Sequence, residues 1–201
     1  MKRVKKIILP VTIMLTIAIT SNVKAQERRL ILDAYYGYGS LYNAVFKALV
    51  ESNASNSNYS GVGPIGVKGE FLISKKVGFG IDIAYSSSMI SYTETDFSTN
   101  EIYDASIQTA KLGIMPTFNY HFVVRDRFDS YFTFGLGYGN RTFSAKSDYA
   151  GYESPTYKSA FPVASRLGLG MRYYFTDNLG LNVGMGLGQG GLLNAGISAR
   201  F

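Results

Sequence analysis

The sequence ends on Leu192-Leu-Asn-Ala-Gly-Ile-Ser-Ala-Arg-Phe201, a stretch in which every second residue is apolar. From Leu193 to Phe201, the odd-numbered residues are Leu, Ala, Ile, Ala and Phe, whereas the even-numbered residues between them are small or polar. Because successive side chains of a strand point to opposite faces of the sheet, this period of two predicts an amphipathic β-strand. An aromatic residue at its end is typical of the strand that closes a barrel.

Seven stretches upstream repeat this alternation, which predicts eight strands in all. In each stretch large apolar residues occupy one face, and glycine with occasional charged residues occupies the other. The predicted strands cover residues 29–39, 61–73, 77–88, 106–122, 131–143, 161–175, 179–188 and 192–201. Pro116 interrupts the fourth strand, and because proline cannot donate to a ladder we expect a bulge or bend there.

The connections between these strands alternate in length. Short charged turns at 74–76, 125–129 and 176–178 alternate with long polar segments, which cover 40–60, 92–105 and 144–160. The last connection, 189–191, is also short. An up-and-down meander with an even number of strands places the charged turns and both termini at one end. The sequence therefore predicts an all-β protein with an eight-stranded antiparallel up-and-down barrel.

The volume of the side chains decides which face of the barrel points inwards. The interior of an eight-stranded barrel is only just wide enough for side chains to fill, so about five large apolar residues per strand do not fit there. The glycine-rich face does fit, which leaves the apolar face to contact lipid, as in a transmembrane barrel. Two groups of aromatic residues bracket the apolar band, as membrane interfaces require. They are Phe71, Tyr120, Phe122, Phe132, Tyr173, Phe175 and Phe201 near the short turns, and Tyr36, Tyr38, Tyr85, Tyr138 and Phe161 near the long connections.

Residues 1–25 have the layout of a secretory signal peptide, with a basic start, an apolar run from Ile7 to Thr20 and a small-residue exit at Ala25. Residues 26–201 then form the barrel domain. Five of the 20 Lys and Arg residues, and none of the 14 Asp and Glu residues, lie in the signal. The remaining 15 basic residues nearly balance the 14 acidic ones, so charge gives no argument for nucleic-acid binding. The chain has no Cys, which excludes disulfides and thiolate metal sites.

With this signal and the terminal segment 194–201, the chain resembles the small outer-membrane β-barrel family of the OmpX/OmpA type. The resemblance implies a monomer in the outer membrane, in contact with outer-membrane lipid and lipopolysaccharide, with both barrel termini in the periplasm. It also implies that Phe201 belongs to the signal that the outer-membrane assembly machinery recognises. The sequence departs from the family in having no Trp and a very short last outer connection.

Charged residues on the predicted lumen face are the main candidates for a functional site. They are Asp33, Lys68, Glu70, Asp82, Lys111, Arg141, Arg166, Arg172 and Arg200. One interpretation is an ion-pair network that fills the lumen and fixes the strand register, because an isolated buried charge is very costly. The alternative is a narrow conduit that passes hydrophobic or anionic solutes. We favour the filled lumen, with a structural or surface-interaction role.

Nothing in the sequence points to an enzyme, a metal or another cofactor. His121, the single histidine, lies near the predicted periplasmic end and is interpreted as a structural residue facing the lumen. The segments 40–60, 92–105 and 144–160 could bind an extracellular partner. Within them, 41–51 has helix-compatible apolar spacing but could equally be an irregular loop. The acidic residues of 92–105 either bind divalent cations or a basic partner, or are simply solvated.

Overall fold

The computed structural model describes residues 29–39, 55–95, 102–149 and 152–201. The predicted signal peptide (1–25) and the helix considered at 41–51 lie outside these residues. All regular structure in the described residues is β-strand. The strands are β1 (Leu30–Tyr38), β2 (Ser55–Ser74), β3 (Val77–Thr95), β4 (Ile102–Val124), β5 (Phe128–Ser147), β6 (Thr156–Lys158), β7 (Val163–Tyr174), β8 (Leu179–Gly188) and β9 (Leu193–Arg200). Among the described residues, no helix is long and apolar enough to span a membrane.

Eight of the nine strands close into a ring. Strands β1 to β5 pair in sequence order, β5 continues to β7, β7 to β8 and β8 to β9, and every pairing is antiparallel. The ring closes where β9 pairs with β1, from Ile31↔Arg200 to Tyr38↔Leu193. The short β6 pairs with β5 alone, at Thr142 to Ser144. The predicted eight-stranded antiparallel barrel is confirmed, and the terminal stretch of the sequence is its closing strand.

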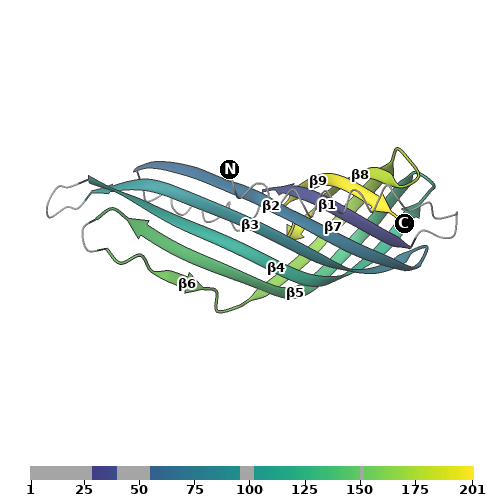
Figure 1. Ribbon diagram of the computed structural model, residues 1–201, viewed down its shortest axis with the longest axis horizontal. Helices are drawn as coiled ribbons and strands as arrows, with labels where there is room; N and C mark the ends of the chain where they lie inside the picture. The colour runs from purple at the N-terminus through teal and green to yellow at the C-terminus, as the bar shows by residue number, and fades with distance from the viewer. Residues whose placement is uncertain (1–28, 40–54, 96–101, 150–151) are drawn as a thin grey trace.

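The strands differ greatly in length, and this gives the molecule its shape. Strands β2 to β5 have 19 to 23 residues, whereas β1, β8 and β9 have only 8 to 10. About 9–11 residues suffice to cross a bilayer. The long strands therefore continue beyond the barrel as a curved sheet, which extends to the left in Figure 1. We call residues 55–64, 86–95, 102–111 and 139–147 the projecting sheet.

The projecting sheet corrects the prediction of three long loops. Residues 55–60, 92–95, 102–105 and 144–147 belong to strands, and 156–158 form β6. The sequence pattern missed them because their outward side chains lose the apolar alternation. On β3 the outward face changes from Ile83 and Tyr85 to Thr93 and Thr95, and backbone ladder bonds hold such a polar strand as well as an apolar one.

Large apolar side chains cover the outside of the ring, as predicted. Ile81 and Leu136, for example, are each 55% exposed, whereas the lumen face carries buried polar residues. Ten of the twelve predicted interface aromatics are exposed on this outer surface, and Phe132 and Phe201 are half-buried. The apolar band with aromatic edges is the surface that a bilayer contacts.

Pro116 does not produce the predicted bulge. Its pairing with Ile81 of β3 continues the register without a shift. Towards β5 the pairing skips Pro116, but Ile114↔Tyr138 and Thr117↔Gly135 keep one register on both sides. Because Pro116 has no N–H donor, the β4–β5 ladder is interrupted at this point, but its register does not shift. The irregularity between β4 and β5 lies instead between His121 and Val123.

Candidate functional site: the Arg172 cluster

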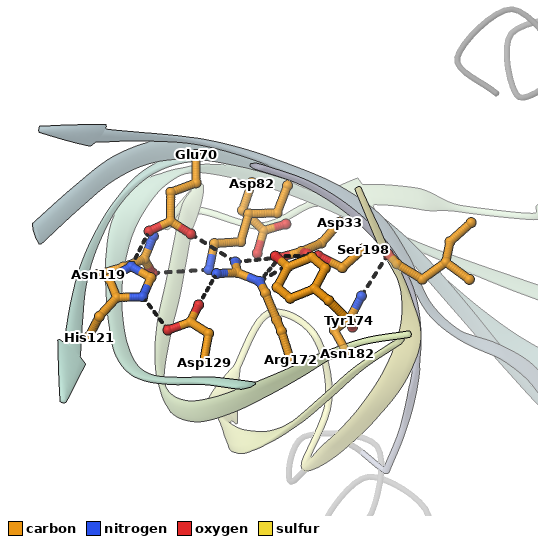
Figure 2. Close-up of polar contacts among 12 residues, drawn as sticks. Asp33, Glu70, Asp82, Asn119, His121, Asp129, Arg172, Tyr174, Asn182 and Ser198 are labelled. Carbon is orange, nitrogen blue, oxygen red and sulfur yellow. Dashed lines mark hydrogen bonds and ion pairs between the residues drawn. The ribbon is translucent and has the colours of Figure 1, made fainter. Parts of the chain in front are cut away.

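The half of the lumen nearest the short turns is organised around Arg172 of β7, which is completely buried. Its guanidinium donates to three carboxylates from three other strands. Nη2 lies 2.6 Å from Asp33 Oδ2 and 2.8 Å from Glu70 Oε2, and Nη1 lies 3.0 Å from Asp129 Oδ2. Nε adds a further bond of 3.1 Å to Asp33 Oδ1. Figure 2 shows these side chains converging from β1, β2, β5 and β7.

His121 of β4 joins two of the same carboxylates. Its Nδ1 lies 2.7 Å from Asp129 Oδ1, and its Nε2 lies 2.7 Å from Glu70 Oε1. Against ionised carboxylates, both contacts are hydrogen bonds only when both ring nitrogens carry a proton, so the arrangement suits an imidazolium. With that charge, the buried lumen residues that the structure describes include four acidic and four basic groups. They are Asp33, Glu70, Asp82 and Asp129, and Lys68, His121, Arg166 and Arg172.

An aromatic ring completes the cluster. The Arg172 guanidinium lies 4.1 Å from the centroid of the Tyr131 ring, and Lys68 Nζ lies 4.3 Å from it. Lys68 also donates to Asn119 Oδ1 at 3.0 Å. The face of the Tyr131 ring therefore helps to stabilise the cations of Arg172 and Lys68, which the carboxylates would otherwise have to neutralise alone. We call Asp33, Lys68, Glu70, Asn119, His121, Asp129, Tyr131 and Arg172 the Arg172 cluster.

Glycines on the lumen face provide the space for these large side chains. A Cβ on Gly170 would collide with the Tyr131 ring, and one on Gly66 would collide with the Tyr35 ring. A Cβ on Gly78 would meet the Glu70 carboxylate. A barrel this narrow can hold tyrosines and ion pairs only where neighbouring strands have no side chain.

A second ion pair lies next to the cluster, towards the projecting sheet. Arg166 Nη1 is 2.7 Å from Asp82 Oδ2, and the Tyr35 hydroxyl donates to Asp82 Oδ1 at 2.8 Å. Beyond it the turn between β8 and β9 folds against β4, where Gln189 Nε2 lies 3.3 Å from the Gly113 carbonyl oxygen. Gly188, Gly190 and Gly191 have positive φ angles, which this tight turn requires.

The structure places six of the nine predicted lumen charges together. Asp33, Glu70 and Arg172 form the centre, Asp82 pairs with Arg166, and Lys68 lies beside Tyr131. Lys111, Arg141 and Arg200 do not reach these ion pairs. Lys111 and Arg141 face each other across β4 and β5, where the projecting sheet begins. The nine residues predicted to form one network therefore lie at three levels along the barrel: six in the ion pairs, Lys111 and Arg141 at one end, and Arg200 at the other.

Arg200 lies at the opposite rim, among the short turns. Its side chain donates to the backbone carbonyl oxygens of Asp126 at 2.7 Å and Asp177 at 2.8 Å, and it stacks on the Tyr174 ring. It therefore ties two turns together at the mouth of the barrel. The mouth is a recess of about 960 Å³ that ends at His121 and Asp129 of the cluster.

Sequence reasoning missed two central members of the cluster. The sequence pattern places Asp129 in a turn, but β5 begins at Phe128, so the Asp129 side chain points to the lumen like those of Tyr131 and Thr133. That shared phase was the available signal. Tyr131 was not singled out because an aromatic side chain was expected only on the lipid face.

The comparison with known protein families agrees with this architecture. A family model described as "Outer membrane protein beta-barrel domain" matches residues 11–195. No curated protein matches the chain. Among solved structures, the N-terminal β-barrel domain of Pseudomonas aeruginosa OprF is 13% identical with a TM-score of 0.43, covering 87% of this chain and 98% of that one. Ail of Yersinia pestis, in complex with the heparin analogue sucrose octasulfate, is 11% identical with a TM-score of 0.41, covering 87% and 99%. Outer membrane protein W of E. coli is 10% identical with a TM-score of 0.40, covering 89% and 100%.

Proposed function

Because the chain belongs to the outer membrane protein beta-barrel domain family, we propose that it is a non-conducting barrel of the outer membrane with a structural or surface-contact role. The observation that carries this proposal is the Arg172 cluster. Four of its members, Glu70, Asn119, His121 and Arg172, are at most 1% exposed. Side chains from five strands thus fill the lumen, and a solute would have to break several buried ion pairs to pass.

The charge balance also argues against an anion conduit. The nine lumen residues predicted from the sequence comprise six basic and three acidic ones, because that set includes Lys111, Arg141 and Arg200 and omits Asp129. In the structure the four buried acids are matched by four basic groups when His121 is protonated. Around Arg172 and Arg166 the lumen is therefore neutral and filled, and it offers no attraction there for an anion.

The projecting sheet supports the surface-contact role. Within the part of the chain that the structure describes, β1 pairs with β2 only as far as Tyr36↔Ile65, so residues 55–62 form a strand edge on that side. Such an edge presents unpaired backbone groups to which another chain can add. With both termini in the periplasm, the projecting sheet would stand outside the cell. It would carry parts of the segments 40–60, 92–105 and 144–160, which could bind an extracellular partner.

A catalytic role finds no support at the single histidine. Both ring nitrogens of His121 already face carboxylates at 2.7 Å, so neither is available to activate a nucleophile. Contact with lipopolysaccharide at the outer surface and recognition of Phe201 by the assembly machinery remain part of the proposal.

Planar-bilayer recordings on the purified chain test the filled lumen. We expect no steady current above the lipid baseline, with an empty-detergent preparation as the control. Discrete and reproducible conductance steps would refute the proposal and favour the transport barrel.

The orientation of the barrel in the membrane can be tested by labelling single introduced cysteines, because the chain has no cysteine of its own. Thr95→Cys in the projecting sheet should react with a membrane-impermeant maleimide on intact cells, whereas Lys75→Cys in a short turn should react only after lysis. Both positions are exposed. The opposite labelling pattern would place the termini outside.

A further inference from the structure

Two neighbouring short turns carry four exposed cations at the rim of the barrel. Lys75 and Lys76 lie between β2 and β3, and Arg125 and Arg127 lie between β4 and β5. The turns are adjacent because β3 pairs with β4, and the His121 N–H donates to the Lys76 carbonyl oxygen at 2.8 Å. We call the four cations the basic sector of the rim.

Tight hairpins fix the position of these cations. The Ser74 hydroxyl accepts a hydrogen bond from the Lys76 N–H at 3.3 Å, which leaves Lys75 and Lys76 as the two residues at the tip of the first turn. The second turn is closed by two backbone hydrogen bonds between Arg125 and Phe128, of 2.8 and 3.3 Å. Because such hairpins leave little slack, the cations stay at the ends of the strands, at one level along the barrel.

Acidic side chains do not neutralise the basic sector. Among the residues that the structure describes, none of the four cations takes part in an ion pair. Residues 74–76 and 125–127 contain one acidic residue, Asp126, so four basic residues against one acidic residue leave a net charge of +3. The next carboxylate along the chain, Asp129, is bonded to Arg172 inside the lumen. The sector therefore presents a net positive charge to its surroundings.

The lipid-facing band of the barrel begins next to these cations. On β4, the exposed side chains of Phe122 and Val124 come directly before Arg125. On β2, the exposed side chain of Ile73 lies two residues before Lys75. Aromatic residues at the edge of such a band lie at the level of the lipid headgroups. The four cations therefore lie at the level of the phosphate groups of the adjacent lipids, with their long apolar stems along the band.

We propose that the basic sector binds the headgroups of anionic phospholipids in the leaflet that faces the short turns. A phosphatidylglycerol molecule brings a net negative charge to the cations and acyl chains to the apolar band beside them, so it matches both parts of this surface. Phosphatidylcholine is zwitterionic, so it gives no such net attraction. Each Lys or Arg close to an anionic membrane surface strengthens the attraction by about fivefold. This inference rests on the proposed placement of the barrel in the outer membrane, and it is independent of whether the lumen conducts.

Quenching of a single introduced tryptophan by brominated lipids tests the sector, because the chain has no Trp of its own. Phe122→Trp places the fluorophore between the two basic turns. Leu181→Trp places it at a similarly exposed position on β8, which is three pairings away from both β2 and β4 around the ring. Each protein is folded into phosphatidylcholine vesicles that contain increasing fractions of brominated phosphatidylglycerol or brominated phosphatidylcholine. The ratio of quenching by the two lipids at one tryptophan reports the local lipid preference, whatever the depth of that tryptophan.

We expect phosphatidylglycerol to be preferred about fivefold or more at Phe122→Trp, with no preference at Leu181→Trp. Replacing the four cations of the basic sector by Gln should abolish the preference at Phe122→Trp. High salt should weaken it, because salt screens exposed charges. The double change Lys146→Gln and Lys158→Gln is the matched control, because it removes two exposed cations of β5 and β6 away from this rim and should leave the preference unchanged.

All variants must first show the heat-modifiable mobility of the folded barrel. If the fourfold variant does not fold, the two turns are changed separately, and each double variant should lose part of the preference. A quenching ratio near one at Phe122→Trp with all four cations present would overturn the proposal. So would an equal preference at Leu181→Trp, or a preference that survives the loss of the cations. The planar-bilayer recordings measure the lumen independently, so a failure of this inference is distinguishable from a failure of the filled barrel.

Discussion

Replacing Arg172 by Met removes the cation that three buried carboxylates share. Arg172 is 0% exposed, and its partners Asp33 and Glu70 are 3% and 1% exposed, so water cannot replace the lost charge without opening the lumen. Breaking a buried ion pair by removing one partner costs about 3–5 kcal/mol. With a urea m-value of about 2 kcal/mol/M, the unfolding midpoint should fall by about 2 M.

The assay is urea unfolding in lipid vesicles, followed by tyrosine fluorescence and by heat-modifiable mobility. Arg200→Met is the matched control, because Arg200 bonds to backbone carbonyl oxygens at the rim, and its midpoint should shift much less. Adding Asp33→Asn to Arg172→Met should restore part of the stability by removing one uncompensated charge. An unchanged midpoint in Arg172→Met, or equal shifts in both arginine variants, would show that Arg172 reaches water.

Three further changes test the cluster, its packing and the closing strand. Gly170→Ala should cost about 1–3 kcal/mol of unfolding free energy because its methyl group displaces Tyr131; Gly69→Ala, which would meet only Leu32 at 3.5 Å, should leave the urea midpoint almost unchanged. His121→Gln should cost about 1–3 kcal/mol, because one amide nitrogen cannot serve two carboxylates on opposite sides, and a wild-type midpoint would contradict this. Phe201→Ala keeps both backbone bonds to Leu30, so it should fold in detergent yet accumulate poorly in cell outer membranes. If Phe201→Ala failed both to fold in detergent and to accumulate in outer membranes, or succeeded in both, Phe201 would have no role in targeting.

The closing strand shows how much of the fold is local. Alternation from Leu193 to Arg200 predicts a strand, its two faces and its place in a barrel, and the structure pairs that strand with β1. The same reasoning failed for residues 55–60 and 144–147, which are strands without an apolar face. A polar strand is stabilised by backbone hydrogen bonds to the adjacent strands, and the sequence of the strand alone does not show which strands will be adjacent.

The sequence alone determined that Asp33, Glu70 and Arg172 face the lumen of a membrane barrel, because each lies on the glycine-rich side of the alternating pattern of its strand. Only the tertiary structure decided that they meet. Arg172 is separated from Asp33 by 139 positions and from Glu70 by 102, and their contact depends on the register of every strand between them. The same registers place Lys111 at the far end of the lumen and bring Asp129 to the centre. Alternation fixes the direction of a side chain, whereas its height along the barrel is fixed only when the ring of ladders closes.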